Sequence, residues 1–103
     1  MSNKPTFGEL IKGDVPVLVD FYATWCGPCK AMAPVLQQVA TELGDEVKVI
    51  KIDIDKNRLL AEKLQIRGVP TFIVYRQGKT LWRDSGMRTA QELKDVIRQA
   101  MVS

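Results

Sequence analysis

The segment from Val15 to Ala23 constrains the fold more than any other part of the sequence. It reads Val-Pro-Val-Leu-Val-Asp-Phe-Tyr-Ala, so apolar side chains occupy both alternating sets of positions, interrupted by Asp20. A strand with one face in water alternates apolar and polar residues, whereas a run that is apolar throughout is typical of a strand covered on both sides. The segment therefore predicts a central strand in a sheet with helices on both faces.

The rest of the chain supplies the elements that such a sheet needs. Apolar residues at helical spacing follow the cysteines as far as Leu43, with Gly44 as the expected C-cap. Thr6 and Thr89 each begin a capping box, which predicts the start of a helix. Further elements are predicted as strands at Val47–Ile54, Pro70–Tyr75 and Thr80–Ser85, a hairpin turn at Gln77-Gly78 and a short helix from its cap at Asn57 to Leu64.

These elements follow one another as helix, strand, helix, strand, helix, strand, strand, helix. A strand–helix–strand unit implies a parallel pair with a right-handed crossover, and the hairpin adds an antiparallel strand. The predicted fold class is α/β, with a mixed sheet of about four strands in the spatial order second, first, third, fourth. The few polar residues before Thr6, which include Pro5, predict no strand there, so Val47–Ile54 should form a sheet edge.

Composition narrows the class of protein. The 103 residues fit a single domain covering positions 1–103, and 46% hydrophobic and 26% charged residues are ordinary for a globular protein. The net charge of +3 arises from scattered Lys and Arg residues without a basic stripe, which argues against nucleic acid as a partner. No stretch resembles a signal peptide or a membrane span, so we expect no membrane partner and a cytoplasmic location.

The two cysteines of the chain, Cys26 and Cys29, are separated only by Gly27 and Pro28. They fall where the predicted central strand gives way to a helix, and a Cys-x-x-Cys pair at such a junction is typical of a redox site. A structural zinc site would need four ligands, and the chain has no His and no third Cys. A static disulfide would close a very small loop and remove little entropy from the unfolded chain.

The position of each cysteine predicts its role. Cys26 should be the nucleophile because free N–H groups at the start of a helix favour its thiolate, and Lys30 adds a cation one turn further on. Cys29 lies one turn deeper, so it should be the more shielded, resolving thiol. Pro28 suits the first turn of a helix, and Gly27 and Pro28 together set the relative stability of the dithiol and disulfide forms.

Two ionisable residues interrupt the predicted strands. Asp20 lies inside the apolar run, where burial should raise its pKa. Such a carboxyl group near a buried thiol can accept and donate a proton, although a purely structural Asp bonded to backbone is an alternative. Lys51 shares a strand face with two valines, so it either pairs with Asp20 or extends its amine into water.

The sequence resembles the thioredoxin family over nearly its whole length. The motif Trp25-Cys26-Gly27-Pro28-Cys29-Lys30 matches residue for residue. The sequence departs from the family pattern in two places. Tyr22 stands where many members carry Trp, and the N-terminus is short for the family's first strand. Further matches occur in register at Asp20, Pro34, Lys51, Gly68-Val69-Pro70-Thr71, Gly78 and Gly86.

The resemblance implies a thioredoxin-like three-layer sandwich and a thiol–disulfide oxidoreductase that reduces protein disulfides. It implies no bound cofactor, because NADPH-dependent thioredoxin reductase would re-reduce the pair, and it implies disulfide-containing client proteins as partners. Asp20 would transfer a proton to and from Cys29, and Gly27-Pro28 would favour a reducing potential. Client binding would involve a cis Pro70 facing the cysteines, the Val69 backbone, Trp25, Gly68 and Gly86.

Two other functions remain open at this stage. An oxidase or isomerase of exported proteins is disfavoured by Gly27-Pro28, since a His at either position would point that way. A non-catalytic subunit of a larger complex would keep its function without either cysteine. Lys48 and Lys51 on the predicted edge strand should discourage pairing with a second chain, so a monomer is expected.

Overall fold

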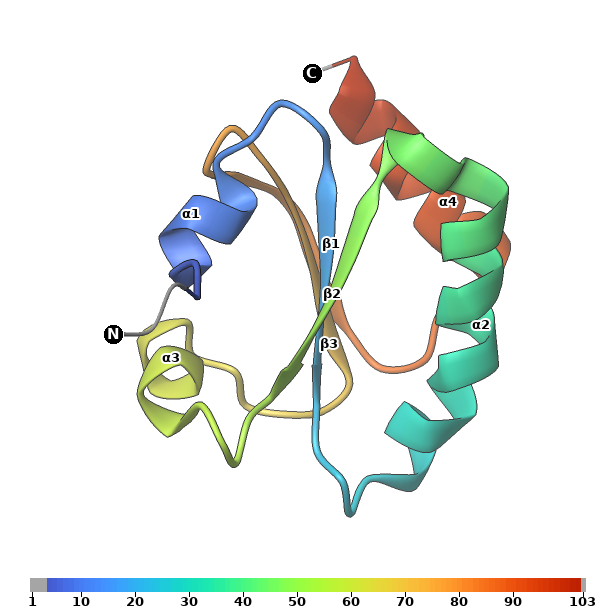
Figure 1. The fold of residues 1–103 in the computed structure, drawn as a ribbon. Coiled ribbons are helices and arrows are strands. Elements are labelled where there is room, and N and C mark those ends of the chain that lie inside the picture. The colour runs from blue at the N-terminus through green and yellow to red at the C-terminus, as the bar shows by residue number, and fades with distance from the viewer. Residues whose placement is uncertain (1–3, 103) are drawn as a thin grey trace.

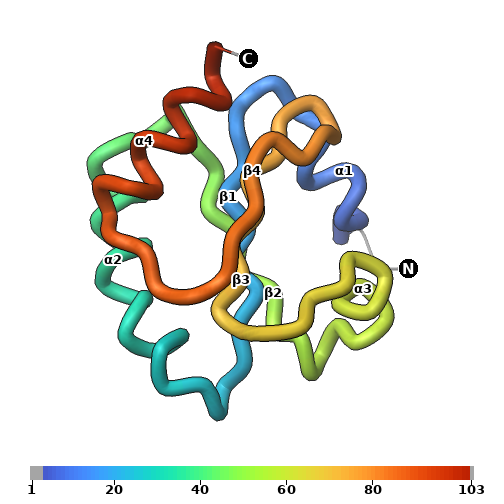
Figure 2. The backbone as a smooth tube through the Cα atoms, turned by 180° about the vertical axis from the view of Figure 1, so that it is seen from behind, coloured from blue at the N-terminus to red at the C-terminus, as the bar shows by residue number. Residues whose placement is uncertain are grey.

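The computed structural model describes residues 4–102, and these form one mixed sheet with helices on both faces (Figures 1 and 2). The sheet has the order β2-β1-β3-β4. Strand β1 pairs in parallel with β2 and antiparallel with β3, and β4 pairs antiparallel with β3. The elements are α1 (Phe7–Ile11), β1 (Val17–Tyr22), α2 (Gly27–Leu43), the 3-10 turn η1 (Gly44–Glu46), β2 (Lys48–Asp53), α3 (Arg58–Lys63), β3 (Thr71–Arg76), β4 (Lys79–Ser85) and α4 (Ala90–Met101).

The predicted sandwich and strand order are confirmed. Helices α1 and α3 lie on one face of the sheet, and α2 and α4 lie on the other (Figure 1). Alternate residues of β1 point into the two separate cores, and each core buries apolar area worth about 25 cal/mol per Å². Leu18 packs beneath α2 and α4 with Met32, Leu36, Val39, Phe72, Val74, Leu93 and Ile97, whereas Val17, Val19 and Phe21 pack with Ile11, Ile73 and Tyr75.

Local signals placed most helix ends correctly. Both predicted capping boxes form, with the Thr6 and Thr89 side chains accepting N–H groups from Glu9 and Glu92. Asn57 does occupy the N-cap position of α3, but its side chain makes no cap bond. It donates instead to the Asp53 carbonyl at 2.9 Å, which holds the turn after β2, so that helix starts without the predicted side-chain cap.

Residues 4–6 form no strand, as predicted, and the remainder of that prediction falls on residues 1–3, which lie outside the described part of the chain. Strand β2 is accordingly one edge of the four-stranded sheet. Within residues 4–102, no helix combines the length and apolar character needed to cross a membrane.

The topology gathers several loops at one end of the sheet. Because β1 and β2 run in parallel and β3 runs the other way, the residues after β1, after β2 and before β3 meet at the same end. The end of β4 joins them, since it pairs antiparallel with β3. These loops carry the cysteines and the residues around Val69.

Candidate active site

The cysteine pair lies where β1 passes into α2. Cys26 occupies the N-cap position of the helix, and Pro28 lies in its first turn. The two cysteines form a disulfide with their Cα atoms 5.3 Å apart. The backbone N–H of Cys29, which lies in the first turn of the helix, donates to Cys26 Sγ at 3.1 Å. This N–H therefore points at the sulfur that would carry the negative charge of a thiolate.

Exposure does not separate the two cysteines, contrary to the prediction that Cys29 is more shielded. Cys26 is 4% exposed and Cys29 is 5% exposed. Both belong to a small buried cluster with Ala23, and Tyr22, Ile54 and Val69 pack against it. The difference between the two sulfurs therefore rests on the helix N-terminus beside Cys26 and on what each sulfur faces.

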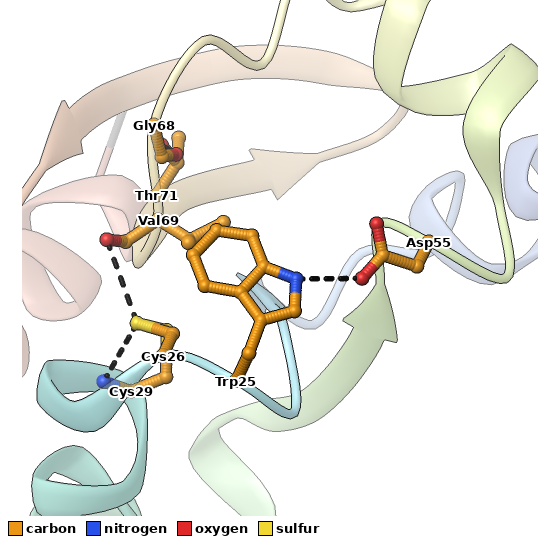
Figure 3. The surroundings of a disulfide bond; sticks show 7 residues. All are labelled: Trp25, Cys26, Cys29, Asp55, Gly68, Val69 and Thr71. Atoms are coloured by element: carbon orange, nitrogen blue, oxygen red, sulfur yellow. Dashed lines mark hydrogen bonds between the residues drawn. A yellow bond between two sulfur atoms is a disulfide. The ribbon is translucent and has the colours of Figure 1, made fainter.

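Cys26 faces the loop before β3. Its Sγ lies 3.7 Å from the Val69 carbonyl oxygen (Figure 3). The Val69–Pro70 peptide bond is cis, as the resemblance implied. The Pro70 carbonyl accepts the Gly86 N–H at 2.8 Å, so the residue that follows β4 is bonded to this loop.

Trp25 projects beside the disulfide and is 67% exposed. Its indole Nε1 donates to Asp55 Oδ2 at 2.8 Å, which fixes the ring over the site (Figure 3). Asp55 was not among the predicted site residues. The signal that could have found it is its position directly after Val47–Ile54, because the carboxyl ends of two parallel strands meet at one edge of the sheet.

Asp20 is fully buried in β1, and neither carboxylate oxygen has a hydrogen-bond partner among the described residues. The alternative of a structural Asp bonded to backbone therefore does not fit this arrangement. Burial raises the pKa of Asp20 from 3.8 to about 6, while the positive charge of Lys51 acts in the opposite direction. A carboxyl group with this pKa exchanges its proton near neutral pH.

Lys51 stands opposite Asp20 in the register of β1 and β2, but the two side chains form no ion pair. Its ammonium group lies 5.0 Å from the centre of the Tyr22 ring, within cation–π range, and Lys51 is exposed. Of the two alternatives for Lys51, the structure therefore shows the exposed amine and not direct pairing with Asp20. A hollow of about 300 Å³, lined by both Lys51 and Cys29, opens beside them, which gives solvent access to Cys29.

The three glycines predicted at the site differ in backbone conformation and in the space around them. Gly86 has a φ of 91°, a left-handed conformation that other residues adopt at a cost. A Cβ added at Gly27 or Gly68 would meet nothing within 4 Å. The chain itself packs nothing against position 68, so the backbone there is open to an approaching client.

The described part of the chain, residues 4–102, contains no group of three or more His, Cys, Asp or Glu side chains placed to hold a metal ion. Apolar side chains and the Val69 backbone carbonyl surround the cysteines, with Trp25 exposed beside them. Such a surface can accept an extended segment beside the sulfurs by pairing with free backbone groups.

Comparisons with known proteins agree with this geometry. A family model described as thioredoxin matches residues 1–99. The chloroplastic thioredoxin Y of rice (Oryza sativa subsp. japonica) is 47% identical over 97 residues, which make up 93% of this chain and 58% of the rice protein. This chain therefore spans less than two thirds of that relative's length.

Two further relatives extend the comparison. A bifunctional thioredoxin reductase/thioredoxin of Mycobacterium leprae is 39% identical over 95 residues, which are 88% of this chain and 21% of the longer protein. The crystal structure of a chloroplastic thioredoxin z superposes with a TM-score of 0.80 at 38% identity, covering 87% of this chain and 81% of that one.

Proposed function

Because the chain belongs to the thioredoxin family, we propose that it reduces disulfide bonds in other proteins through the Cys26–Cys29 pair. The observation that carries this proposal is the position of Cys26 Sγ, which accepts a helix N–H at 3.1 Å and lies 3.7 Å from the Val69 carbonyl. A client cysteine approaching Cys26 would bring its own backbone beside the Val69 loop, where pairing would align the two sulfurs.

The reaction proceeds in two exchanges. The Cys26 thiolate attacks one client sulfur, a bond forms between them, and the other client sulfur leaves as a thiolate that takes up a proton. Cys29 then loses its proton and attacks Cys26 Sγ, which closes the intramolecular disulfide and releases the second client sulfur. The client gains two electrons and two protons, and the cysteine pair is oxidised.

Asp20 is proposed as the proton acceptor for Cys29. Its carboxyl group has no competing hydrogen bond, and a pKa of about 6 lets it take up a proton at neutral pH. Cys29 lines the hollow beside Lys51, and we propose that a water molecule carries the proton from its thiol to the buried Asp20 carboxylate. Lys51 would adjust the charge balance at this position without bonding to Asp20.

We propose thioredoxin reductase as the electron donor, with NADPH as the source of electrons and no cofactor bound to this chain. The Mycobacterium leprae relative, whose name joins both activities in one protein, supports such a pairing. We also propose a cytoplasmic location, because a cysteine pair that must be re-reduced after each turnover needs a reducing compartment.

The function is tested by coupling NADPH oxidation to the reduction of a protein disulfide in the presence of a bacterial thioredoxin reductase. We expect NADPH consumption that depends on this chain, and none with the double variant Cys26→Ser, Cys29→Ser. Activity in the double variant would instead favour a non-catalytic binding subunit. Net oxidation of a reduced protein by the disulfide form, in glutathione buffer, would favour the oxidase alternative.

We propose a monomer in solution. At one edge of the sheet, β2, Lys48 and Lys51 are exposed, and self-pairing of this strand across a two-fold axis would bring the lysines of both copies together. Sedimentation equilibrium at micromolar concentration should give the mass of one chain, 11.6 kDa. A stable dimer would contradict the proposal of a monomer.

A further inference from the structure

The turn that ends α3 has an unusual residue at its key position. Ile66 N–H donates to the Ala61 carbonyl at 2.9 Å, and Gln65 N–H donates to the Glu62 carbonyl at 3.0 Å. This pair of bonds is the Schellman motif, which places its C′ residue in the left-handed conformation. Glycine usually fills that position, but here Gln65 adopts a φ of 55°. The turn therefore carries backbone strain that something else must offset.

Arg83 of β4 supplies a compensating contact. Its Nη1 donates to the Leu64 carbonyl at 2.6 Å, and its Nη2 donates to the Gln65 carbonyl at 2.8 Å. These carbonyls lie at the negative end of a helix, where a cation is favoured. The planar guanidinium can bind both oxygens at once, which a lysine ammonium cannot match.

The same strand holds the other end of the loop. Ser85 and Thr71 share a hydrogen bond at 2.9 Å, and the Thr71 hydroxyl donates to the Gly68 carbonyl at 2.6 Å. The Gly86 N–H also donates to the Pro70 carbonyl. Strand β4 is thus bonded to the segment 64–71 at both ends. Val69, whose carbonyl faces Cys26 (Figure 3), lies between these attachments in the sequence.

We propose that Arg83 is a positioning residue for client binding: by clamping the strained turn at Gln65, it holds the Val69 loop in the conformation that pairs with a client backbone. Arg83 is remote in sequence from the cysteines and touches neither of them. The inference rests on the proposed function, because it assigns Arg83 to the binding step of that reaction.

Loss of the Arg83 contact should lower the fraction of molecules whose Val69 loop is in the client-binding conformation. When only a fraction of the molecules holds the binding conformation, the apparent affinity falls by that fraction. Loss of a charge-assisted contact commonly changes such an equilibrium by about three- to tenfold. A small disulfide makes little use of the loop backbone, so its reduction should be insensitive to Arg83.

The test compares Arg83→Gln and Arg83→Lys with Lys79→Gln, which removes one positive charge from the exposed start of the same strand. For Arg83→Gln we expect KM for a protein disulfide to rise about three- to tenfold with kcat within about twofold, and hydroxyethyl disulfide reduction to stay within about twofold. Arg83→Lys should recover part of the KM, and Lys79→Gln should match the parent chain. Equal losses on both substrates, or an unchanged KM, would overturn the proposal.

Hydrogen exchange and a second substitution separate the clamp from a general loss of stability. In Arg83→Gln, the bonded amides of Gln65 and Ile66 should exchange faster while those of β1 do not. Adding Gln65→Gly should restore KM toward the parent value, since glycine adopts the left-handed conformation without strain. Failure of this rescue, or unchanged exchange, would contradict the clamp. If the parent chain itself reduces no protein disulfide, the proposed function fails, and the exchange data still decide whether Arg83 holds the turn.

Discussion

Replacing Cys26 with serine should abolish protein-disulfide reduction, with a loss of at least about 10³-fold, because no other thiolate lies at the start of α2. Replacing Cys29 with serine should also stop turnover, but for a different reason. Cys26 would still attack a client, and the mixed disulfide would persist because the resolving thiol is missing. Non-reducing gels and mass spectrometry would detect this adduct at the sum of the two masses.

The comparison of the two variants distinguishes the roles of two cysteines that are equally buried. The adduct should form with Cys29→Ser, disappear on reduction, and be absent with Cys26→Ser under identical conditions. A Cys26→Ser protein that captured clients as well as Cys29→Ser would show that the helix N-terminus does not decide which sulfur attacks. The exposures of 4% and 5% predict no difference, so the result depends on the helix N-terminus beside Cys26 and on what each sulfur faces.

The features that the sequence predicted are those encoded by neighbouring residues. The apolar run around Asp20 indicated a central strand, and β1 is indeed paired on both sides. The Cys-x-x-Cys spacing placed one cysteine at the cap of α2 and the other one turn inside it. The hairpin at Gln77-Gly78 has positive φ at both residues, 54° and 78°, which matches the twist that tight hairpins require.

The contacts that the sequence did not predict join residues far apart in the chain. Asp55 lies 30 positions from Trp25, and Arg83 lies 19 positions from Leu64. Periodicity reports which face of an element is apolar, but not which exposed side chain meets another element. An Arg on an edge strand normally reads as a solvated charge, so its two carbonyl partners could be found only from the fold.

Lys51 shows that strand register alone does not decide a side-chain contact. It stands beside Asp20 on the neighbouring strand, which left both pairing and an exposed amine open. The ammonium group nevertheless lies over the Tyr22 ring, where it keeps its contact with water and avoids the dehydration that an ion pair with a fully buried carboxylate would require. Asp20 is left without a bonded counter-charge, and this decides how it affects stability.

Asp20→Asn should stabilise the protein at neutral and alkaline pH. In the unfolded chain Asp20 loses its proton near pH 3.8, whereas in the folded protein its pKa is about 6. Below pH 3.8 the group is neutral in both states and makes no difference. Between the two pKa values the folded state retains a proton that the unfolded state has lost, so the free energy of unfolding falls as the pH rises. Above pH 6 the loss is complete, at about 3 kcal/mol for two pKa units.

An asparagine at this position has no proton to lose, so it should escape the whole pH-dependent loss. Urea unfolding of the oxidised proteins should show Asp20→Asn about 2–3 kcal/mol more stable than the parent at pH 8 and nearly equal to it at pH 3.5. Its rate of protein-disulfide reduction should fall, and the rise of that rate between pH 5 and 7 should flatten, because the proton acceptor for Cys29 is gone.

Asp53→Asn provides the matched control for the stability measurement. Asp53 is also a mostly buried strand carboxylate, but its Oδ1 accepts backbone N–H groups from Asp55 at 2.8 Å and Lys56 at 3.2 Å. Because this buried carboxylate already has hydrogen-bond partners, its replacement should not stabilise the protein at pH 8 or at pH 3.5. If both variants were equally stabilised at pH 8, the removal of any buried negative charge, and not the missing hydrogen bonds of Asp20, would explain the effect. If Asp20→Asn gave no pH-dependent gain, folding would not raise the pKa of Asp20, and its assignment as the proton acceptor would fall with it.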